Sequence, residues 1–365
     1  MSLPERDWPT VGGGPAHTGF VPDATALSAP TTDWSAHLGG WPHSPPVVAD
    51  GAVVVAEPTR VRALSAADGT GRWRGDLQHP PSGAPGIDPE AGVVYVPTAD
   101  PTTANEGAFL TAFDLGTGDR AWRTRVDPEA VYAVTAADGV AYARTRRGCV
   151  AVVDGVVRWR RDDLGKTGYD RFNANDGMDL AGAVTPAVVD GTVYVPARNA
   201  LVALDAADGT ERWRVPVAHA FAAPTVVEDT VYAVGVSEVA AVETDGRVRW
   251  RSTEHGGYGS AAVADDRVYV VDDQLSALDA TDGTEQWTAD GGQTVASDTV
   301  VVGQMACVHD GGLTAYDRGT GRLTELVGRG RWQTDVETAG YCPVAVGAGR
   351  LFTVQPFERR LVALS

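Results

Sequence analysis

The chain has 365 residues, and its hydrophobic content of 43% is ample for a buried core, which excludes a disordered protein. Its 48 acidic and 30 basic residues give a formal net charge of −18, which excludes nucleic acids and anionic membranes as partners because both require a basic surface. No stretch reaches the roughly 18 uncharged apolar residues of a membrane span, so we expect no direct membrane insertion.

The kinds of charged residue indicate a salt-rich habitat. Only one of the basic residues is a lysine, Lys166, and acidic residues dominate the charged positions. Such a surface keeps its hydration in concentrated salt, where repulsion between like charges is screened within a few ångströms. We therefore expect a halophilic protein.

From residue 46 onward the chain repeats one motif, which reads A-L-D-A-A-D-G-T-E-R-W at 203–213. A seventh copy, which keeps less of the motif, ends at Leu323. The ends of most consecutive copies lie 36 or 37 residues apart. The tryptophans that end the other six copies are Trp73, Trp122, Trp159, Trp213, Trp250 and Trp287. A fixed period of this length is typical of a repeat architecture.

Each unit predicts four short strands, as residues 186–213 illustrate. Runs at 187–189 and 193–195 flank Asp190-Gly191, which is a strong hairpin signal because both turn residues take positive φ. A third run at 201–205 leads through the D-x-x-D-G turn to a fourth strand that carries the tryptophan. Four antiparallel strands per unit, with no helical period, predict a propeller blade.

The two ends of the chain complete the count of blades. The last unit, 342–365, stops after its third strand and has no turn or tryptophan, whereas residues 31–38 hold Trp34 in the setting of an outer strand. Pairing the two removes a free sheet edge. The sequence therefore predicts a single domain over residues 1–365, an all-β, eight-bladed β-propeller closed by an N-terminal outer strand.

The repeated motif is interpreted as a structural joint. Its Asp and Gly form the turn between the third and fourth strands, and its tryptophan lies on the outer strand. There the ring can fill the wedge between diverging blades, with its N–H near backbone acceptors. We assign this docking role to Trp34 and to the six repeat tryptophans.

The motif resembles the tryptophan-docking repeat of the quinoprotein-type, or PQQ-like, eight-bladed propellers. The opening W-P-T-V-G-G-G-P-A-H-T-G at 8–19 is similar to the lead-in of many exported members. Within that family the chain is closest in character to the non-enzymatic, BamB-like members. The resemblance implies a binding or assembly scaffold at the cell surface, with any leader or lipid anchor outside this sequence. A cytoplasmic protein is the alternative.

The family also contains PQQ-dependent dehydrogenases that oxidise alcohols or sugars, which gives the alternative function. Those enzymes stack the quinone on a disulfide between adjacent cysteines, whereas Cys149, Cys307 and Cys342 are not neighbours. Matching calcium ligands are also not found. We therefore expect no cofactor and no metal, with PQQ and calcium as the alternative. The thiols are expected to be buried, and a Cys307–Cys342 disulfide stays open.

Any binding site is expected at one mouth of the channel, where loops break the repeat. The longest insertion, 160–185, is rich in oxygen ligands, but its glycine does not match EF-hand spacing, so we favour a solvated loop over a calcium site. No nucleophile–base spacing predicts a catalytic residue. We expect a monomer that binds a protein, peptide or glycan. The candidate surface comprises Trp41, His43, Tyr169, Asn173, Asn175, Asp176, His219, His255, Tyr258, Trp332 and Tyr341.

Overall fold

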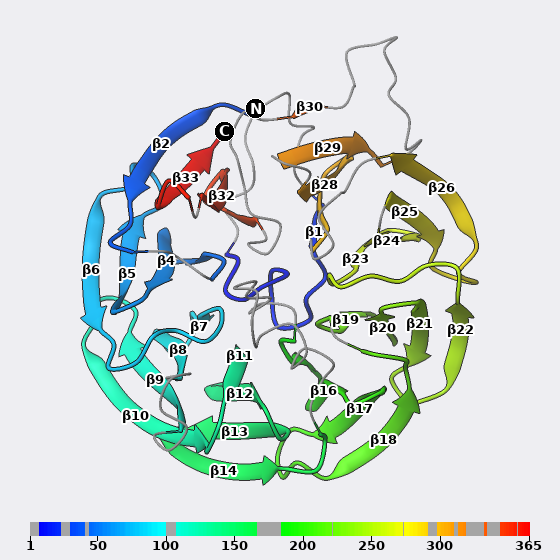
Figure 1. The fold of residues 1–365 in the computed structure, drawn as a ribbon, viewed down its shortest axis with the longest axis horizontal. Coiled ribbons are helices and arrows are strands. Elements are labelled where there is room, and N and C mark those ends of the chain that lie inside the picture. The colour runs from blue at the N-terminus through cyan, green and yellow to red at the C-terminus, as the bar shows by residue number, and fades with distance from the viewer. Residues whose placement is uncertain are drawn as a thin grey trace.

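Eight sheets are arranged around a central axis in the computed structural model of the protein, and they form a closed ring (Figure 1); all are antiparallel apart from one added strand that pairs in parallel. The structure describes residues 7–22, 30–40, 44–99, 107–165, 184–220, 222–272, 274–290, 298–309, 313–318, 332–333, 344–355 and 357–365. No helix occurs in these residues. The predicted all-β, eight-bladed propeller is confirmed.

The blades follow one another in chain order, from the innermost strand to the outermost. Blades 1 to 4 are β3 (Val47–Ala49), β4 (Ala52–Glu57), β5 (Arg60–Ser65) and β6 (Gly71–Asp76); β7 (Gly86–Asp88), β8 (Val93–Ala99), β9 (Ala108–Asp114) and β10 (Arg120–Asp127); β11 (Val131–Ala137), β12 (Val140–Thr145), β13 (Cys149–Val153) and β14 (Val156–Arg161); and β15 (Ala187–Val189), β16 (Thr192–Ala197), β17 (Ala200–Asp205) and β18 (Glu211–Pro216).

Blades 5 to 8 continue the ring, and the first two strands of the chain join the last two blades. Their strands are β19 (Thr225–Val227), β20 (Thr230–Gly235), β21 (Glu238–Glu243) and β22 (Val248–Ser252); β23 (Ala262–Ala264), β24 (Arg267–Val271), β25 (Gln274–Asp279) and β26 (Glu285–Asp290); β27 (Val300–Val302), β28 (Met305–His309), β29 (Leu313–Asp317) and β30 (Trp332–Gln333) with β1 (Phe20–Val21); and β31 (Ala345–Gly347), β32 (Arg350–Gln355), β33 (Arg360–Leu364) and β2 (Thr32–His37).

The core lies between neighbouring blades. The second strand of a blade is covered on both sides, and all six residues of β4 are buried. The outer strand has only one covered side, and the residues of β6 are mostly exposed. Short strands rich in valine and alanine suit this arrangement, because β-branched side chains pack well on pleated surfaces that lie face to face.

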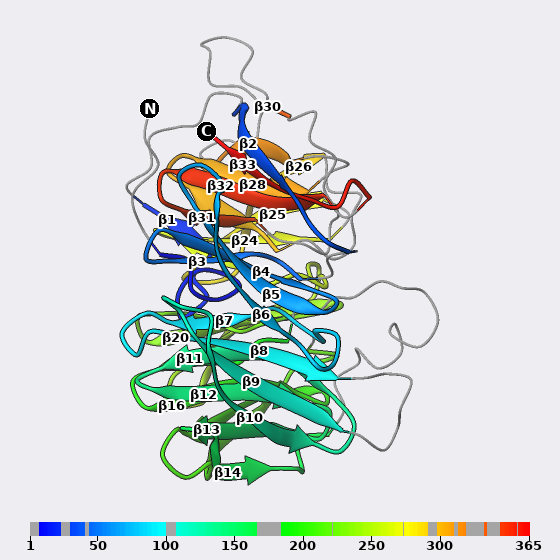
Figure 2. The same ribbon diagram turned by 90° about the vertical axis from the view of Figure 1, so that its left-hand side faces the viewer.

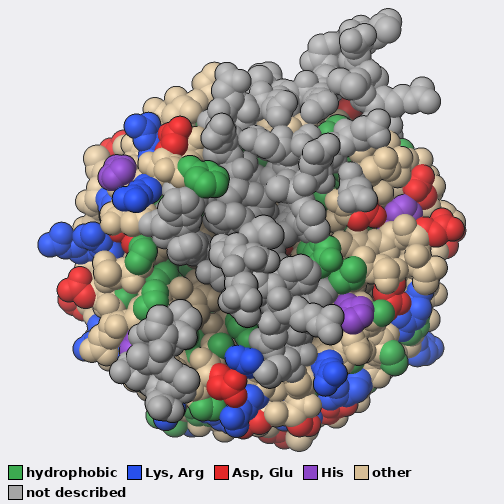
Figure 3. Space-filling view, viewed as in Figure 1, with side chains coloured by type: hydrophobic (Ala, Val, Ile, Leu, Met, Phe, Trp, Pro, Cys, Tyr) green, Lys and Arg blue, Asp and Glu red, His purple; other side chains and the backbone are tan. Residues whose placement is uncertain are grey.

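The blades divide the molecule into two faces, seen edge-on in Figure 2; Figure 3 shows the surface of the face that is turned toward the viewer in Figure 1. We call turn face the side that carries the hairpins between the first and second and between the third and fourth strands. The loop face carries the other hairpins and the connections between blades. The 166–183 segment, which belongs to the predicted insertion at 160–185, lies outside the described residues, as does the 100–106 segment.

The ring is closed by its two ends, as the sequence predicts. Strand β2 pairs antiparallel with β33, from Thr32 opposite Leu364 to His37 opposite Arg360. The backbone of Ser365 exchanges two hydrogen bonds with that of Thr31, at 2.8 and 3.0 Å. Blade 8 therefore takes three strands from the C-terminus and its outer strand from the N-terminus.

The repeated motif forms a joint between adjacent blades. The Trp73 Nε1 of blade 1 donates to the Leu115 carbonyl of blade 2 at 2.6 Å, and the indole packs on Gly118. A tilted tyrosine or phenylalanine of the second strand supports the ring, as Tyr142 does for Trp159. The other tryptophans that donate to a carbonyl of the next blade, at 2.8 to 3.2 Å, are Trp34, Trp159, Trp213, Trp250 and Trp287; Trp122 packs on Gly155.

The register of these tryptophans is the same in every blade. Trp73 lies opposite Ala63, and each docking tryptophan likewise lies opposite an alanine of the third strand. In blade 7 the residue opposite Ala315 is Trp332, not Leu323. The backbone of Trp332 therefore holds the register position of a docking tryptophan, which the sequence alignment had given to Leu323.

Residues 7–22 form a plug along the axis of the ring (Figure 1). Backbone hydrogen bonds join this segment to the innermost strands of blades 1, 2, 4, 5, 6 and 7, with Trp8 bonded to Val48 at one end and Gly19 to Val301 at the other. In blade 3, His17 Nε2 lies 3.3 Å from Thr135 Oγ1. The opening motif at 8–19 therefore has a structural role in filling the channel.

Candidate functional site

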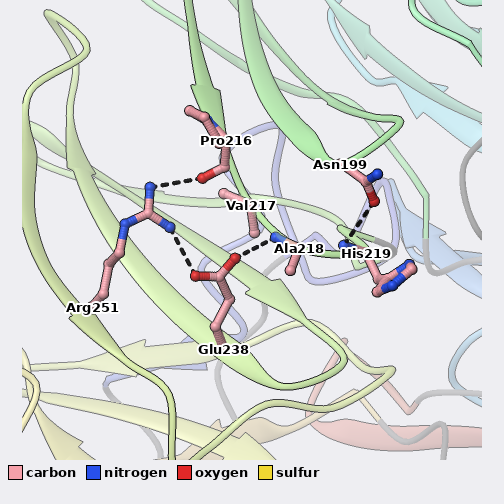
Figure 4. Close-up of a pocket in the computed structure, with 7 residues that line it drawn as sticks. All are labelled: Asn199, Pro216, Val217, Ala218, His219, Glu238 and Arg251. Atoms are coloured by element: carbon pink, nitrogen blue, oxygen red, sulfur yellow. Dashed lines mark hydrogen bonds and ion pairs between the residues drawn. The ribbon is translucent and has the colours of Figure 1, made fainter.

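An open groove of about 400 Å³ lies on the loop face between blades 4 and 5 (Figure 4). Its residues come from the hairpin after β16, the connection after β18, the start of β21 and the strand β22. They are Asn199, Pro216, Val217, Ala218, His219, Glu238 and Arg251. The groove includes His219, one of the predicted surface residues.

Both oxygens of the Glu238 carboxylate accept hydrogen bonds from residues that line the groove. The carboxylate accepts a hydrogen bond from the Ala218 N–H and another from Arg251 Nη1 at 2.8 Å. The second guanidinium nitrogen of Arg251 donates to the Pro216 carbonyl at 2.7 Å. A carboxylate with these partners orders the chain between two blades and is not poised as a general base.

Two residues in left-handed conformations shape the other end of the groove. Asn199 has a φ of 54° and His219 a φ of 51°. The Asn199 side-chain oxygen accepts from the His219 N–H at 3.3 Å, and its carbonyl accepts from the Val217 N–H at 3.2 Å. The groove thus presents mainly apolar and backbone atoms, with His219 at the end away from Arg251 (Figure 4), a lining suited to binding rather than to bond cleavage.

Two other predicted residues lie one blade further round the ring. His255 is buried between blades 5 and 6, and its Nε2 is 3.3 Å from Glu285 Oε2. Tyr258 is half-buried in the same connection. His219, His255 and Tyr258 therefore share the loop face, but they do not line one groove.

The remaining predicted residues divide into two groups. Trp332 lies in the outer strand β30, with the register described above. The residues that lie outside the described part of the chain are Trp41, His43, Tyr169, Asn173, Asn175, Asp176 and Tyr341. Their place on the candidate surface stays a prediction.

A buried cation that the sequence analysis missed lies in blade 3. Arg144 in β12 is fully buried, and its guanidinium donates to backbone carbonyls, including those of Pro196 at 3.0 Å, Gly148 at 2.6 Å and Gly165 at 2.9 Å. Gly165 belongs to the 160–185 insertion and is the last described residue before its 166–183 segment. Backbone carbonyls occur at every residue, so these acceptors leave no signal in the sequence.

The thiols of the two described cysteines have low reactivity. Cys149 in blade 3 and Cys307 in blade 7 are both free, and burial raises the pKa of each to about 12. A thiol with so high a pKa is a poor nucleophile at neutral pH. Cys342 lies outside the described residues.

Two features of the described residues bear on the quinone alternative. The two described cysteines stand in opposite parts of the ring rather than side by side, and the axis that would form a chamber holds the plug. Within the described ranges, no group of three or more His, Cys, Asp or Glu side chains could hold a metal ion. No helix of the described chain is long and apolar enough to cross a membrane.

A comparison with protein families finds one matching family model, described as "Outer membrane protein assembly factor BamB", over residues 22–100, 59–244 and 235–351. These segments together cover most of the chain. A comparison with curated protein sequences finds no match.

Several solved structures share the fold at low sequence identity. BamB from Moraxella catarrhalis is 17% identical, with a TM-score of 0.72 over 93% of this chain and 98% of that one. The quinohemoprotein alcohol dehydrogenase of Comamonas testosteroni is 15% identical, with a TM-score of 0.73 over 98% and 80%. The computationally designed Ika8 protein is 12% identical, with a TM-score of 0.69 over 90% and 98%.

Proposed function

Because the chain belongs to the PQQ-like propeller family whose model is described as "Outer membrane protein assembly factor BamB", we propose that it is a non-catalytic scaffold. It binds a protein, peptide or glycan on the loop face, where the groove at His219 and the connection that holds His255 and Tyr258 lie. The opposite, turn face offers short, uniform hairpins that give a partner little to distinguish.

The plug is the observation that carries this proposal. Residues 7–22 hold seven of the eight innermost strands, six by backbone hydrogen bonds and one through His17. Trp8 and His17 are 4% and 1% exposed, so the segment is part of the core and not a loose tail. A ring whose axis is filled in this way offers its outer loops, rather than a central chamber, to partners.

The setting of the scaffold is also part of the proposal. The family description names an outer-membrane assembly factor, and this supports a protein outside the cytoplasm, at the cell surface. The net charge of −18 supports a halophilic source. We expect a monomer, and fractionation of native cells would test the location against a cytoplasmic one.

Cross-linking from defined positions tests the loop face directly. A photoreactive amino acid at His219 should cross-link to a partner in native cells, because the side chain lines the open groove. The control position is Ala207, which is exposed in a turn-face hairpin of blade 4. Equal cross-linking from Ala207, or cross-linking from Ala207 alone, would move the binding surface away from the loop face.

A PQQ-dependent dehydrogenase remains the second candidate, favoured by the shared fold with the quinohemoprotein alcohol dehydrogenase. Titration with the quinone and calcium separates the two. The scaffold predicts no saturable binding, no thermal shift and no dye-linked oxidation of alcohols or sugars. A micromolar Kd, equivalent to about 8 kcal/mol of binding free energy, would raise the melting temperature in excess ligand and overturn the scaffold.

A further inference from the structure

Two hairpins rich in arginine lie side by side on the loop face, one from blade 8 and one from blade 1. Arg359 lies between β32 and β33, whereas Arg60 and Arg62 open β5. The end of β2 connects them, because Arg62 Nη1 donates to the His37 carbonyl at 2.9 Å and the Leu38 N–H donates to the Arg359 carbonyl at 2.7 Å. The two hairpins therefore form one continuous surface.

This surface is locally basic in a strongly acidic protein. The buried Glu57 already pairs with Arg60 at 3.0 Å and with Arg62 at 3.1 Å. The exposed Glu358 lies 3.9 Å from Arg360, whose side chain is 51% exposed. Four arginines against these two glutamates leave two positive charges, whereas the whole chain carries −18.

An exposed aromatic side chain lies at the tip of the blade 8 hairpin. Phe357 is 71% exposed, and it is the one aromatic among the large hydrophobic residues that the described structure exposes. A single exposed apolar residue is ordinary on a soluble protein. Beside Arg359 and Arg360, however, it gives the combination of aromatic and arginine side chains that is enriched at the centres of protein interfaces.

We propose that this arginine surface, made of Phe357, Arg359, Arg360, Arg60 and Arg62, binds an acidic segment of a partner protein that carries an apolar side chain. The inference rests on the proposed scaffold function and names the chemistry of its partner. Guanidinium groups match carboxylates in geometry as well as charge. At physiological salt, screening within about 8 Å lets these local charges act despite the net negative charge of the protein.

The acidity of the remaining surface would contribute to selectivity. An acidic segment is repelled by the surrounding carboxylates, so it is held only where arginines outnumber them. The apolar side chain of the segment would cover Phe357. Nucleic acid would share the attraction to arginine but not the apolar contact, and it is an outcome of the test.

The probe is a fluorescent twelve-residue peptide of aspartate and glutamate with two leucines, and a second peptide replaces the acids with lysine. Anisotropy is measured at the lowest salt concentration at which circular dichroism shows the native fold, and again in 1 M NaCl. We expect saturable binding of the acidic peptide alone, at least tenfold weaker in the higher salt.

Variants locate the binding. Phe357→Ala, and separately Arg359→Asn with Arg360→Glu, should each weaken binding at least tenfold; asparagine is chosen because Arg359 has a φ of 53°. The control, Arg147→Gln with Arg198→Glu, makes the same charge change on other loop-face hairpins and should stay within twofold.

The proposal is overturned if the acidic peptide does not bind, if the control weakens binding as much as the surface variants do, or if single-stranded DNA binds equally well. Such a result, together with persistent cross-linking from His219, would remove the arginine surface and leave the scaffold function standing. Loss of both the peptide binding and the cross-linking from His219 would remove the scaffold function as well.

Discussion

The indole of Trp250 in blade 5 lies directly against the backbone of Gly283 in blade 6. Its Nε1 donates to the Ala280 carbonyl at 2.9 Å, and a Cβ placed on Gly283 would lie 2.5 Å from the ring. Gly283 also has a φ of 76°. The glycine of each repeat is therefore required twice, by its own turn and by the tryptophan of the preceding blade.

Substitution of this glycine separates the two requirements. We expect Gly283→Ala to lower the free energy of unfolding by about 3 kcal/mol, since left-handed strain costs about 1 kcal/mol and displacement of a packed ring adds about 2 kcal/mol. The control is Gly139→Ala, where φ is 75° and no atom lies within 4 Å of the added Cβ. For Gly139→Ala, chemical denaturation should show a loss of only about 1 kcal/mol, which is the cost of the left-handed strain. Equal losses of unfolding free energy in Gly283→Ala and Gly139→Ala would contradict the interpretation of the tryptophan–glycine contact as a joint between blades.

Much of this fold follows from the sequence because its signals are local. The Asp-Gly hairpins and the repeat spacing lie within single blades, and they predict the strands and the blade count correctly. Blade 7 was aligned wrongly because its third and fourth strands are separated by 14 residues, 318–331, so Leu323 matched the repeat spacing in place of Trp332.

The plug and the buried cation could not be predicted in the same way. The backbone partners of residues 7–22 are single groups spread from Val48 to Gly303, and no period in the sequence links them. Arg144 donates to carbonyls, which every residue carries. The groove at His219 depends on two left-handed residues, Asn199 in a hairpin of blade 4 and His219 in the connection to blade 5.

Arg144 gives a second prediction, on stability. Replacement by methionine keeps much of its volume but leaves buried carbonyls, including those of Pro196 and Gly165, without their donor. We expect Arg144→Met to lower the free energy of unfolding by about 3 kcal/mol or more. Arg247→Met, at a side chain that is 76% exposed, should cost under about 1 kcal/mol. A cost at Arg144 as small as that at Arg247 would show that these carbonyls find other donors.

Nested deletions test the closure of the ring. Removal of residues 1–22 takes away the plug, and removal of residues 1–40 also takes away β2, which leaves β33 as an open edge. We expect the melting temperature to fall with the first deletion and to fall further, with aggregation, with the second. Identical melting curves for the two truncated proteins would mean that β2 contributes nothing to closure.

His17 makes stability depend on pH. Burial lowers its pKa from 6.5 to about 4, so the folded protein favours the neutral ring. The contribution to stability is complete above about pH 6.5, declines by about 3 kcal/mol in total as the pH falls from 6.5 to about 4, and changes little below that. His17→Asn, which suits the φ of 54°, should flatten this part of the curve relative to the wild type. The control is His37→Asn at an exposed position, and a flattening of the same size there would assign the effect elsewhere.

The plug and the closing strand have a consequence for how the protein is made. Residues 7–22 are synthesised before all eight blades, yet their last partners are at Val301 and Gly303, and β2 has no partner until β33 has been synthesised. Blades 1 to 6 can each form from their own contiguous strands meanwhile. Residues 7–22 and β2 thus reach their final positions only after blades 7 and 8 have been synthesised, and a translation product that lacks these blades leaves both segments without those partners and open to proteolysis.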